Sequence, residues 1–307
     1  MHKKTSKQAP LWHPKYLFSW LIVFTLYLFS SIPLRTKLWL GAKLGPILAK
    51  KMRSRVTIAR KNIRTCFPKL DEKQIEQRVV ECMSQLAMGA LEAPHAWWRD
   101  MSRHQGDVTI IGQDHLMKAH AKGKGVLIMG GHFAAVDFII PLFAAEVVDR
   151  VELGYMYRPD NNPVIDRMIV KGRERHKVTG FTKRQLKEMI SFIREGGMVW
   201  YGCDQDFGKH ADLFVPFFGI QAANISTPSW IVRESGATVV FMSMRRLAKC
   251  KYEFEFSREL PSFGEDPAKD AAVWNHELEK AIKEQPSQYF WIHRRFKTRP
   301  PGEPKFY

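Results

Sequence analysis

A histidine and an aspartate five residues apart are the side chains of this sequence best suited to chemistry. His132 and Asp137 stand in the run Gly-Gly-His-Phe-Ala-Ala-Val-Asp, directly after the apolar segment 126–129. A carboxylate bonded to one imidazole nitrogen fixes the tautomer and stabilises the imidazolium that forms when the other nitrogen takes a proton. Such a pair is a general base suited to a hydroxyl nucleophile. The alternative interpretation is a helix-capping histidine and a solvated aspartate.

The sequence around His132 favours the chemical interpretation. An apolar run, two glycines that allow a sharp turn, and helical periodicity over 134–146 predict a strand, a turn and a helix. Reactive groups in open α/β sheets gather at the carboxyl ends of strands. Asp137 lies too far round a regular helix to face His132, so we expect His132 in the turn and Asp137 in the first helical turns. No serine or cysteine occupies a nucleophile-elbow pattern, which predicts direct transfer to a substrate hydroxyl.

Polar residues also follow two other predicted strands. Arg158 comes after 151–157, where it could hold an anionic group or stabilise an oxyanion, or else pair with a nearby aspartate, Asp160 or Asp166.

Asp204 and Asp206 follow the predicted strand 198–203. Paired carboxylates can bind Mg²⁺, but no phosphate-cradling glycine loop accompanies them. We therefore expect them to position substrate and orient neighbouring groups, and we expect no metal.

Two aromatic segments could contact a lipid. Phe214 and Phe217 lie in an apolar run, 213–219, that could line a slot for a hydrocarbon chain, although core packing is the more frequent explanation. The segment 289–297, which includes Arg294 and Arg295, interleaves aromatics with cations. That composition suits phosphate headgroups at a membrane and also nucleic acid.

These residues require a scaffold, and the periodicity predicts a mixed α/β domain with a largely parallel sheet flanked by helices. Residues 37–100 are predicted to be helical, with a turn at 67–71. The segment 252–256 is predicted to be an edge strand. The remaining predicted strands and helices are 125–129, 151–157, 198–203 and 238–244, and 134–146, 183–195, 227–236 and 266–284, with a further helix opened by Asn162-Pro163.

The N-terminal region predicts a membrane anchor. Residues 16–34 carry no charge and are barely long enough to span a bilayer, which needs about 20 apolar residues. Pro33, Leu34 and Arg35 follow the apolar run in place of a small-residue cleavage site, so we expect a retained anchor within residues 1–36. Basic residues flank the apolar segment on both sides, so the positive-inside rule gives only a weak preference for a cytoplasmic location of the rest of the chain. A helix that lies in the membrane interface is the alternative to a membrane-spanning helix.

Composition sets the remaining bounds. The 307 residues carry a formal net charge of +17, which points to an anionic partner. The four cysteines form no C-x-x-C pair, which argues against a zinc site or a disulfide framework and predicts reduced thiols on the cytoplasmic side.

Taken together, these motifs resemble the lauroyl and myristoyl transferases of lipid A biosynthesis, within the lysophospholipid acyltransferase superfamily. The resemblance runs nearly end to end, through segments 13–21, 130–137, 157–166, 199–208, 214–219 and 289–300. It implies an acyltransferase domain over 37–307, with a basic helical region at 37–106 and a catalytic α/β core at 107–307.

The resemblance also implies an activity: transfer of a fatty acyl chain, lauroyl by family likeness, from acyl carrier protein to a hydroxyl of a Kdo-bearing lipid A precursor. The reaction would serve lipopolysaccharide synthesis at the cytoplasmic face of a bacterial inner membrane, with acyl carrier protein as co-substrate and no other cofactor. His132 would be the base, Asp137 its partner, and Arg158 and Asp206 active-site residues. The family has Asp or Glu at the position of Asp137.

Two alternatives stay open at this stage. Acyltransferases that make phosphatidic acid from glycerol phosphate esters use the same base, but they usually carry a Pro-Glu-Gly-Thr run where this chain has Cys203-Asp204-Gln205-Asp206. A membrane-tethered nucleic-acid-binding protein would fit the charge, although no recognisable motif supports it.

Overall fold

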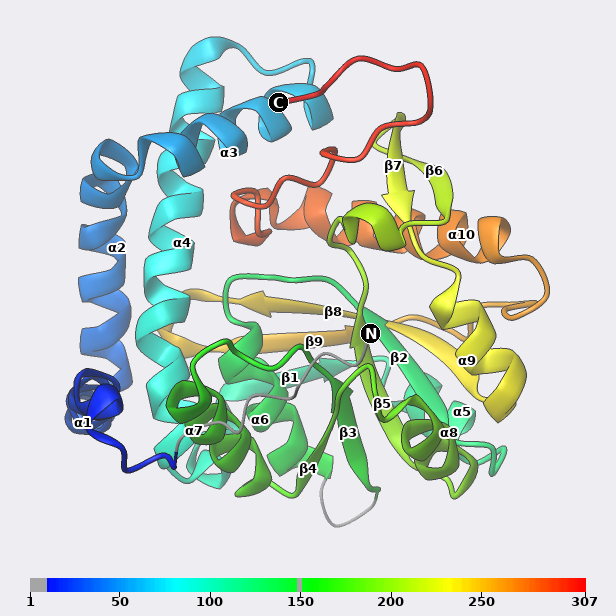
Figure 1. Ribbon diagram of the computed structural model, residues 1–307, viewed down its shortest axis with the longest axis horizontal. Coiled ribbons are helices and arrows are strands. Elements are labelled where there is room, and N and C mark those ends of the chain that lie inside the picture. Colours follow the sequence, from blue (N-terminus) through cyan, green and yellow to red (C-terminus); the bar gives the residue numbers. More distant parts are fainter. Residues whose placement is uncertain (1–9, 148–150) are drawn as a thin grey trace.

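A mixed seven-stranded sheet lies at the centre of the molecule. The computed structural model describes residues 10–147 and 151–307 (Figure 1). Five strands, in the order β8-β2-β5-β3-β4, run parallel, and β9 and β1 continue the sheet in the opposite direction. The predicted α/β fold with a largely parallel sheet is therefore confirmed. The strands are β1 Val108–Ile111, β2 Val126–Gly130, β3 Leu153–Met156, β4 Val178–Phe181, β5 Met198–Gly202, β8 Thr238–Arg246 and β9 Tyr252–Phe256.

Helices flank this sheet, and a helical layer stands beside it (Figure 1). The layer consists of α2 Leu34–Lys51, α3 Arg53–Cys66 and α4 Glu72–Trp98, which confirms the predicted helical region and the turn at 67–71. A capping box between Asp71 and Gln74 starts α4. The helices near the sheet are α5 Gln113–His120, α6 Val136–Val147, α7 Pro163–Glu174, α8 Leu186–Arg194, α9 Thr227–Ser235 and α10 Pro267–Glu284.

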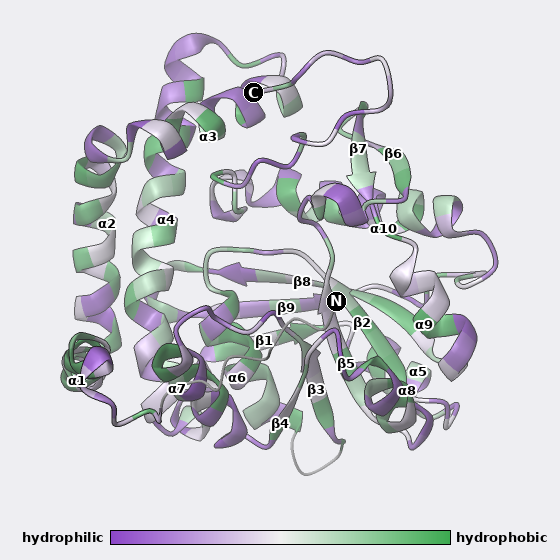
Figure 2. Cartoon of the chain, in the orientation of Figure 1, coloured by the Kyte–Doolittle hydropathy of each residue, from purple (hydrophilic) through white to green (hydrophobic). Residues whose placement is uncertain are grey.

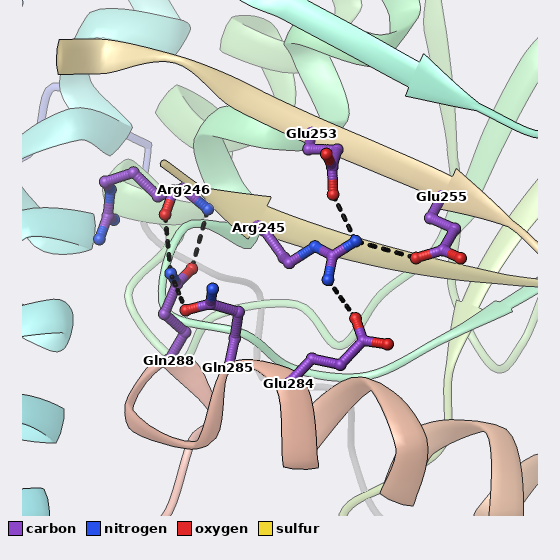
Figure 3. Close-up of polar contacts among 7 residues, drawn as sticks. All are labelled: Arg245, Arg246, Glu253, Glu255, Glu284, Gln285 and Gln288. Carbon is purple, nitrogen blue, oxygen red and sulfur yellow. Dashed lines mark hydrogen bonds and ion pairs between the residues drawn. The ribbon is translucent and has the colours of Figure 1, made fainter. Parts of the chain in front are cut away.

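The prediction that 252–256 is an edge strand is wrong, because β9 lies between β1 and β8. Its alternation arises because Tyr252 is buried in the core while Glu253 and Glu255 point to the other face. Arg245 of β8 forms ion pairs with both glutamates and with Glu284 of α10 (Figure 3). Charges that suggested an exposed edge are thus satisfied across a strand pair.

The apolar run 213–219 forms a hairpin that the sequence did not predict. Its strands are β6 Leu213–Phe217 and β7 Ile220–Asn224. The two turn residues, Phe218 and Gly219, have φ values of 50° and 77°, and a two-residue hairpin turn of this hand requires positive φ at both positions. Phenylalanine is an uncommon residue for that conformation, so the turn carried no recognisable signal.

Close helix packing fixes α4 against its neighbours. A Cβ atom on Gly41 of α2 would lie 2.6 Å from the Cα of Met88. A Cβ atom on Gly89 would lie 1.8 Å from the carbonyl oxygen of Ala134, in the turn that follows β2. These glycines let α2 and α4 approach, and let α4 approach the turn that carries His132.

The segment after α10 supports the same turn. Gln288 bonds the backbone of Arg246 in both directions, accepting from its N–H at 2.9 Å and donating to its carbonyl at 2.8 Å (Figure 3). The Gln288 carbonyl accepts from the N–H of Ala134 at 2.8 Å, and the N–H of Phe290 donates to the His132 carbonyl at 3.1 Å. The His132 turn is therefore tied to β8 through the chain at 288–290.

A buried ion pair between Glu92 and Arg246 lies in the core. Glu92 of α4 accepts from Nε of Arg246 at 2.8 Å and from the Tyr252 hydroxyl at 2.5 Å. The neighbouring strand β2 is hydrophobic along its length (Figure 2). The pair joins α4 to the sheet where no solvent reaches either charge.

Glu92→Ala is expected to destabilise the fold by about 3–5 kcal/mol, because it leaves the Arg246 guanidinium buried without its anion. Urea unfolding followed by tryptophan fluorescence measures the loss. Glu76→Ala is the matched control, since Glu76 pairs with Arg60 at the surface and should cost at most about 1 kcal/mol. Equal losses for the two variants would contradict the expectation.

Candidate active site

His132 lies at the carboxyl end of a central strand. It is the second residue after β2, in the turn that leads into α6, and its side chain is 29% exposed. The Trp200 ring of β5 stands edge-on to the imidazole, with centroids 6.0 Å apart. Neither Gly130 nor Gly131 has a positive φ; a Cβ atom at Gly131 would instead lie 2.4 Å from Leu278 Cδ1. The glycines supply space for this turn rather than an unusual backbone conformation.

Asp204 is the carboxylate that hydrogen-bonds His132. Its side chain is 1% exposed, and it accepts from His132 Nδ1 at 2.5 Å and from the His132 backbone N–H at 2.9 Å. An ionised carboxylate only accepts, so Nδ1 carries the proton and Nε2 is left with its lone pair. This is the tautomer that a general base requires.

The electrostatics match this hydrogen bond. Burial alone would lower the pKa of His132, but the charge of Asp204 and the hydrogen bond to it outweigh burial and raise the pKa above its ordinary value. Burial would raise the pKa of Asp204, but His132 lowers it. The pair therefore stabilises the imidazolium that would form during proton transfer.

Asp137 has a different partner. It stands in the first turn of α6, as expected, and forms an ion pair with Arg173 of α7. The guanidinium of Arg173 lies over the Tyr155 ring, 4.5 Å from its centroid. In the described structure Asp137 makes no hydrogen bond to His132, although its charge also raises the pKa of that histidine. A catalytic role for Asp137 stays a prediction.

Two cavities meet at His132, and His132, Val136 and Asp137 line both. The first, here called the apolar cavity, has a volume of about 430 Å³. Its walls come mainly from α4 and from the turn after β2, and the N-terminal helix α1 Leu17–Ser30 contributes Leu26; the other lining residues include Leu86, Ala93, Trp97, Phe133 and Phe290. These mainly apolar walls suit a hydrocarbon chain.

The second cavity, here called the cationic cavity, has a volume of about 290 Å³ and contains Arg158 and Arg173. Within residues 10–147 and 151–307, Arg158 forms no ion pair, and Asp166 instead accepts from the Asp160 backbone N–H at 2.9 Å. Since Arg173 is neutralised by Asp137, Arg158 is the cation available there to an anionic group.

The other predicted site residues lie elsewhere. Asp206 accepts from the backbone N–H and hydroxyl of Thr298 at 2.6 and 2.8 Å, which holds the C-terminal segment. Arg295 is 2% exposed, donates to the Ala223 carbonyl at 2.6 Å and lies over the Phe217 ring.

Phe217 is fully buried, Phe214 of the same strand β6 is half-buried, and Arg294 is exposed. The described residues that line the two cavities do not include these five predicted site residues, Asp206, Phe214, Phe217, Arg294 and Arg295. Asp204 and Asp206 also face different partners, so they do not converge on one point. The four cysteines are buried and free, and burial raises the pKa of Cys203.

Arg173, Tyr155 and the α4 residues of the apolar cavity were not predicted. Arg173 lies in the last turn of α7, with no adjacent motif, and Tyr155 belongs to a strand. Only the tertiary fold, which packs α7 against α4 and β4, brings Arg173 to Asp137 and Tyr155, so no local sequence signal marked these residues.

The imidazole of His132, supported by a carboxylate and with one nitrogen free, lies between an apolar and a cationic cavity at the carboxyl end of a parallel strand, an arrangement suited to general-base chemistry. The reaction class follows from comparison with known proteins. The chain belongs to the bacterial lipid A biosynthesis acyltransferase family, whose sequence model matches residues 4–298, and it is an acyltransferase.

Relatives of known activity cover almost the whole chain. The lipid A biosynthesis lauroyltransferase of Escherichia coli (strain K12) is 34% identical over 97% of this chain and 97% of its own length. The lipid A biosynthesis palmitoleoyltransferase of the same organism is 30% identical, with 96% of each chain covered. The lipid A biosynthesis myristoyltransferase of that organism is 26% identical over 95% of this chain and 90% of its own length. The family acts in lipid A biosynthesis, which implies a lipid A precursor as substrate.

Proposed function

We propose that this enzyme transfers a fatty acyl chain, lauroyl by preference, from acyl carrier protein to a hydroxyl of a Kdo-bearing lipid A precursor. The reaction would occur at the cytoplasmic face of the bacterial inner membrane, with the N-terminal segment 1–36 as anchor. The observation that carries the proposal is the free Nε2 of His132 where the apolar and cationic cavities meet. The greater identity to the lauroyltransferase supports the chain length.

The proposed chemistry is direct transfer. Nε2 of His132 takes the proton from the acceptor hydroxyl as the oxygen attacks the thioester carbonyl, and Asp204 stabilises the resulting imidazolium. The tetrahedral intermediate then collapses, the carbon–sulfur bond breaks, and the imidazolium returns the proton to the departing thiolate. The nearby guanidinium of Arg158 is a candidate to stabilise the oxyanion.

The two cavities suggest how the substrates divide. The donor chain would lie in the apolar cavity, since each buried methylene gains roughly 0.8 kcal/mol. An anionic group of the acceptor would lie in the cationic cavity beside Arg158. The net charge of +17 would favour both an acidic carrier protein and a phosphorylated lipid.

The test supplies a Kdo-bearing lipid A precursor and acyl carrier protein loaded with chains of about ten to sixteen carbons, which differ in the number of methylenes that can be buried. The mass of the lipid product is then measured. A mass gain of one acyl group on the precursor supports the proposal. Acylation of glycerol phosphate esters alone would instead favour the phospholipid acyltransferase. Nucleic-acid binding with a steep salt dependence and no acyl transfer would favour the membrane-tethered binding protein.

Chain length should depend on the walls of the apolar cavity. Ala93→Leu from α4 and Leu26→Trp from α1 both introduce larger side chains that reduce the volume of this cavity, so each should shift the preferred donor to shorter chains. The ratio of kcat/KM for donors of different length measures the shift. Phe214→Leu is the control, because Phe214 lies outside this cavity, and a shift in that variant alone would place the chain along the 213–224 hairpin.

A further inference from the structure

Helix α1 has two opposite stripes of side chains. Ser19, Val23, Leu26 and Ser30 follow helical spacing and are buried or half-buried against the body. On the opposite side, the outer stripe consists of Leu17, Leu21, Phe24 and Leu28, which are 74%, 58%, 57% and 54% exposed. A row of large apolar side chains at this exposure is unfavourable in water and indicates a partner.

The inner stripe is fixed to the body of the enzyme. Ser19, near the start of α1, accepts a 2.8 Å hydrogen bond from Asn162, the N-cap of α7. Val23 and Leu26 pack on a small cluster built by α4 and α7, which contains Ala93, Trp97 and Met168. These contacts along the length of the helix hold α1 against α4 and α7.

The C-terminal end of α1 is fixed as well. The Ser30 carbonyl accepts from Nζ of Lys37 at 2.9 Å, and the Ser30 hydroxyl accepts from Nε of Arg99 at 3.1 Å. Lys37 also meets His95 Nδ1 at 3.1 Å, inside the α1–α2–α4 junction. Burial, with the charge of Arg99, lowers the pKa of Lys37 to about 8. Both ends of α1 are thus held by buried polar contacts.

This arrangement conflicts with a membrane span. Among the described residues, no individual helix has the length and apolar composition to cross a bilayer. Helices Pro14–Ser30 and Leu34–Lys51 meet these two criteria only when they are taken as a pair, and the pair is bent by 118°. The 14 residues of α1 extend about 21 Å, against a hydrocarbon core of about 30 Å. A span would also draw Asp166 and Arg167 of α7, beside the Asn162 contact, into hydrocarbon.

We propose that α1 lies in the plane of the membrane surface, with the outer stripe inserted among the lipid chains and the inner stripe closing the apolar cavity. The occupant of the exposed face is an anionic phospholipid surface, since Lys15 and Arg35 flank α1 and the basic residues Lys43 and Lys50 follow on α2. Trp39 and Ile47, 60% and 49% exposed on α2, extend the apolar face.

The orientation has a consequence for the reaction. Because Leu26 belongs both to α1 and to the wall of the apolar cavity, that cavity adjoins the lipid phase along the seam between α1 and α4. A lipid chain can then reach His132 laterally. This consequence rests on the proposed function, whereas the orientation of α1 is measured without any transfer activity.

Protease access distinguishes a surface helix from a span. The full chain, with one epitope tag at each terminus, is expressed in bacteria, and spheroplasts and inverted inner-membrane vesicles are treated with protease. A surface helix leaves both tags on the cytoplasmic side, so both are protected in spheroplasts and cleaved in inverted vesicles. Tags on opposite sides of the membrane would overturn the proposal.

Vesicle binding tests the outer stripe. Purified full chain is floated with phosphatidylglycerol–phosphatidylethanolamine vesicles, and the double variant Phe24→Glu with Leu28→Glu is expected to bind at least about tenfold more weakly. Ile111→Glu is the matched control, because Ile111 is an exposed apolar residue of β1 and its replacement should leave binding unchanged. Unchanged binding by the double variant, or an equal loss in the control, would overturn the proposal. Circular dichroism of each variant is the check that it is folded.

Discussion

His132→Ala is expected to abolish acyl transfer while the protein stays folded. The imidazole is the base of the proposed mechanism, and loss of general-base catalysis alone removes about 10² to 10⁴ of the rate. Single-turnover transfer of a labelled acyl chain to the lipid A precursor measures the effect. His210→Ala is the matched control, since His210 is exposed and lies outside both cavities. Undiminished turnover by His132→Ala would exclude the proposed base.

The pH dependence of the wild-type enzyme follows from the same histidine. Only neutral His132 accepts a proton, and its pKa is raised above the ordinary value near 6.5. The specificity constant kcat/KM should therefore rise with pH and then level off, with an apparent pKa above about 6.5. An acid limb at or below that value would show that Asp204 does not control the titration.

Asp204→Asn is expected to lower kcat by about 10³ to 10⁴, more than Asp137→Asn does. The asparagine amide can donate to Nδ1, which would hold the imidazole in the wrong tautomer with the proton on Nε2. The acid limb of the residual activity should also move to lower pH, because the anion that raises the pKa of His132 is gone. Initial rates across pH, with both variants at saturating substrate, give the comparison.

Asp137→Asn should have a smaller effect, on the order of tenfold to a hundredfold by loss of positioning. It releases Arg173 from its ion pair, and the change should appear in KM as well as kcat because Arg173 lines the cationic cavity. If Asp137→Asn proved as damaging as Asp204→Asn, with the same shift in pH profile, Asp137 would be the partner of His132 during turnover, as the H-x-x-x-x-D spacing predicts.

The strand, turn and helix around His132 could be predicted because local composition determines them. The pairing of Asp204 with His132 could not, although Asp204 was expected to orient neighbouring groups in the site. In the parallel pair β2–β5, Gly130 lies opposite Gly202, so His132 and Asp204 each stand two residues beyond matched positions. Sequence separation hides that relation, and only the order and register of the strands reveal it.

Residues that act through tertiary packing were the hardest to predict. Leu26 stands in a run of uniformly apolar residues, and nothing in that run distinguishes a side chain facing a cavity from one facing lipid. Asp206 and Arg295 belong to motifs of the site, yet they hold the C-terminal segment and the 213–224 hairpin in place. Shared motifs mark residues that a fold needs for positioning as well as those that contact substrate.

The meeting of two separate cavities at one imidazole has a consequence for kinetics. None of the described residues that line either cavity is a serine, threonine or cysteine, so the acyl group has no protein atom of those types on which to rest between the two substrates. In the proposed direct transfer, donor and acceptor therefore occupy the enzyme together. Initial velocities measured against one substrate at several fixed levels of the other should give intersecting reciprocal plots, the pattern of a ternary complex, and each turnover should leave the enzyme with no covalent trace of its donor.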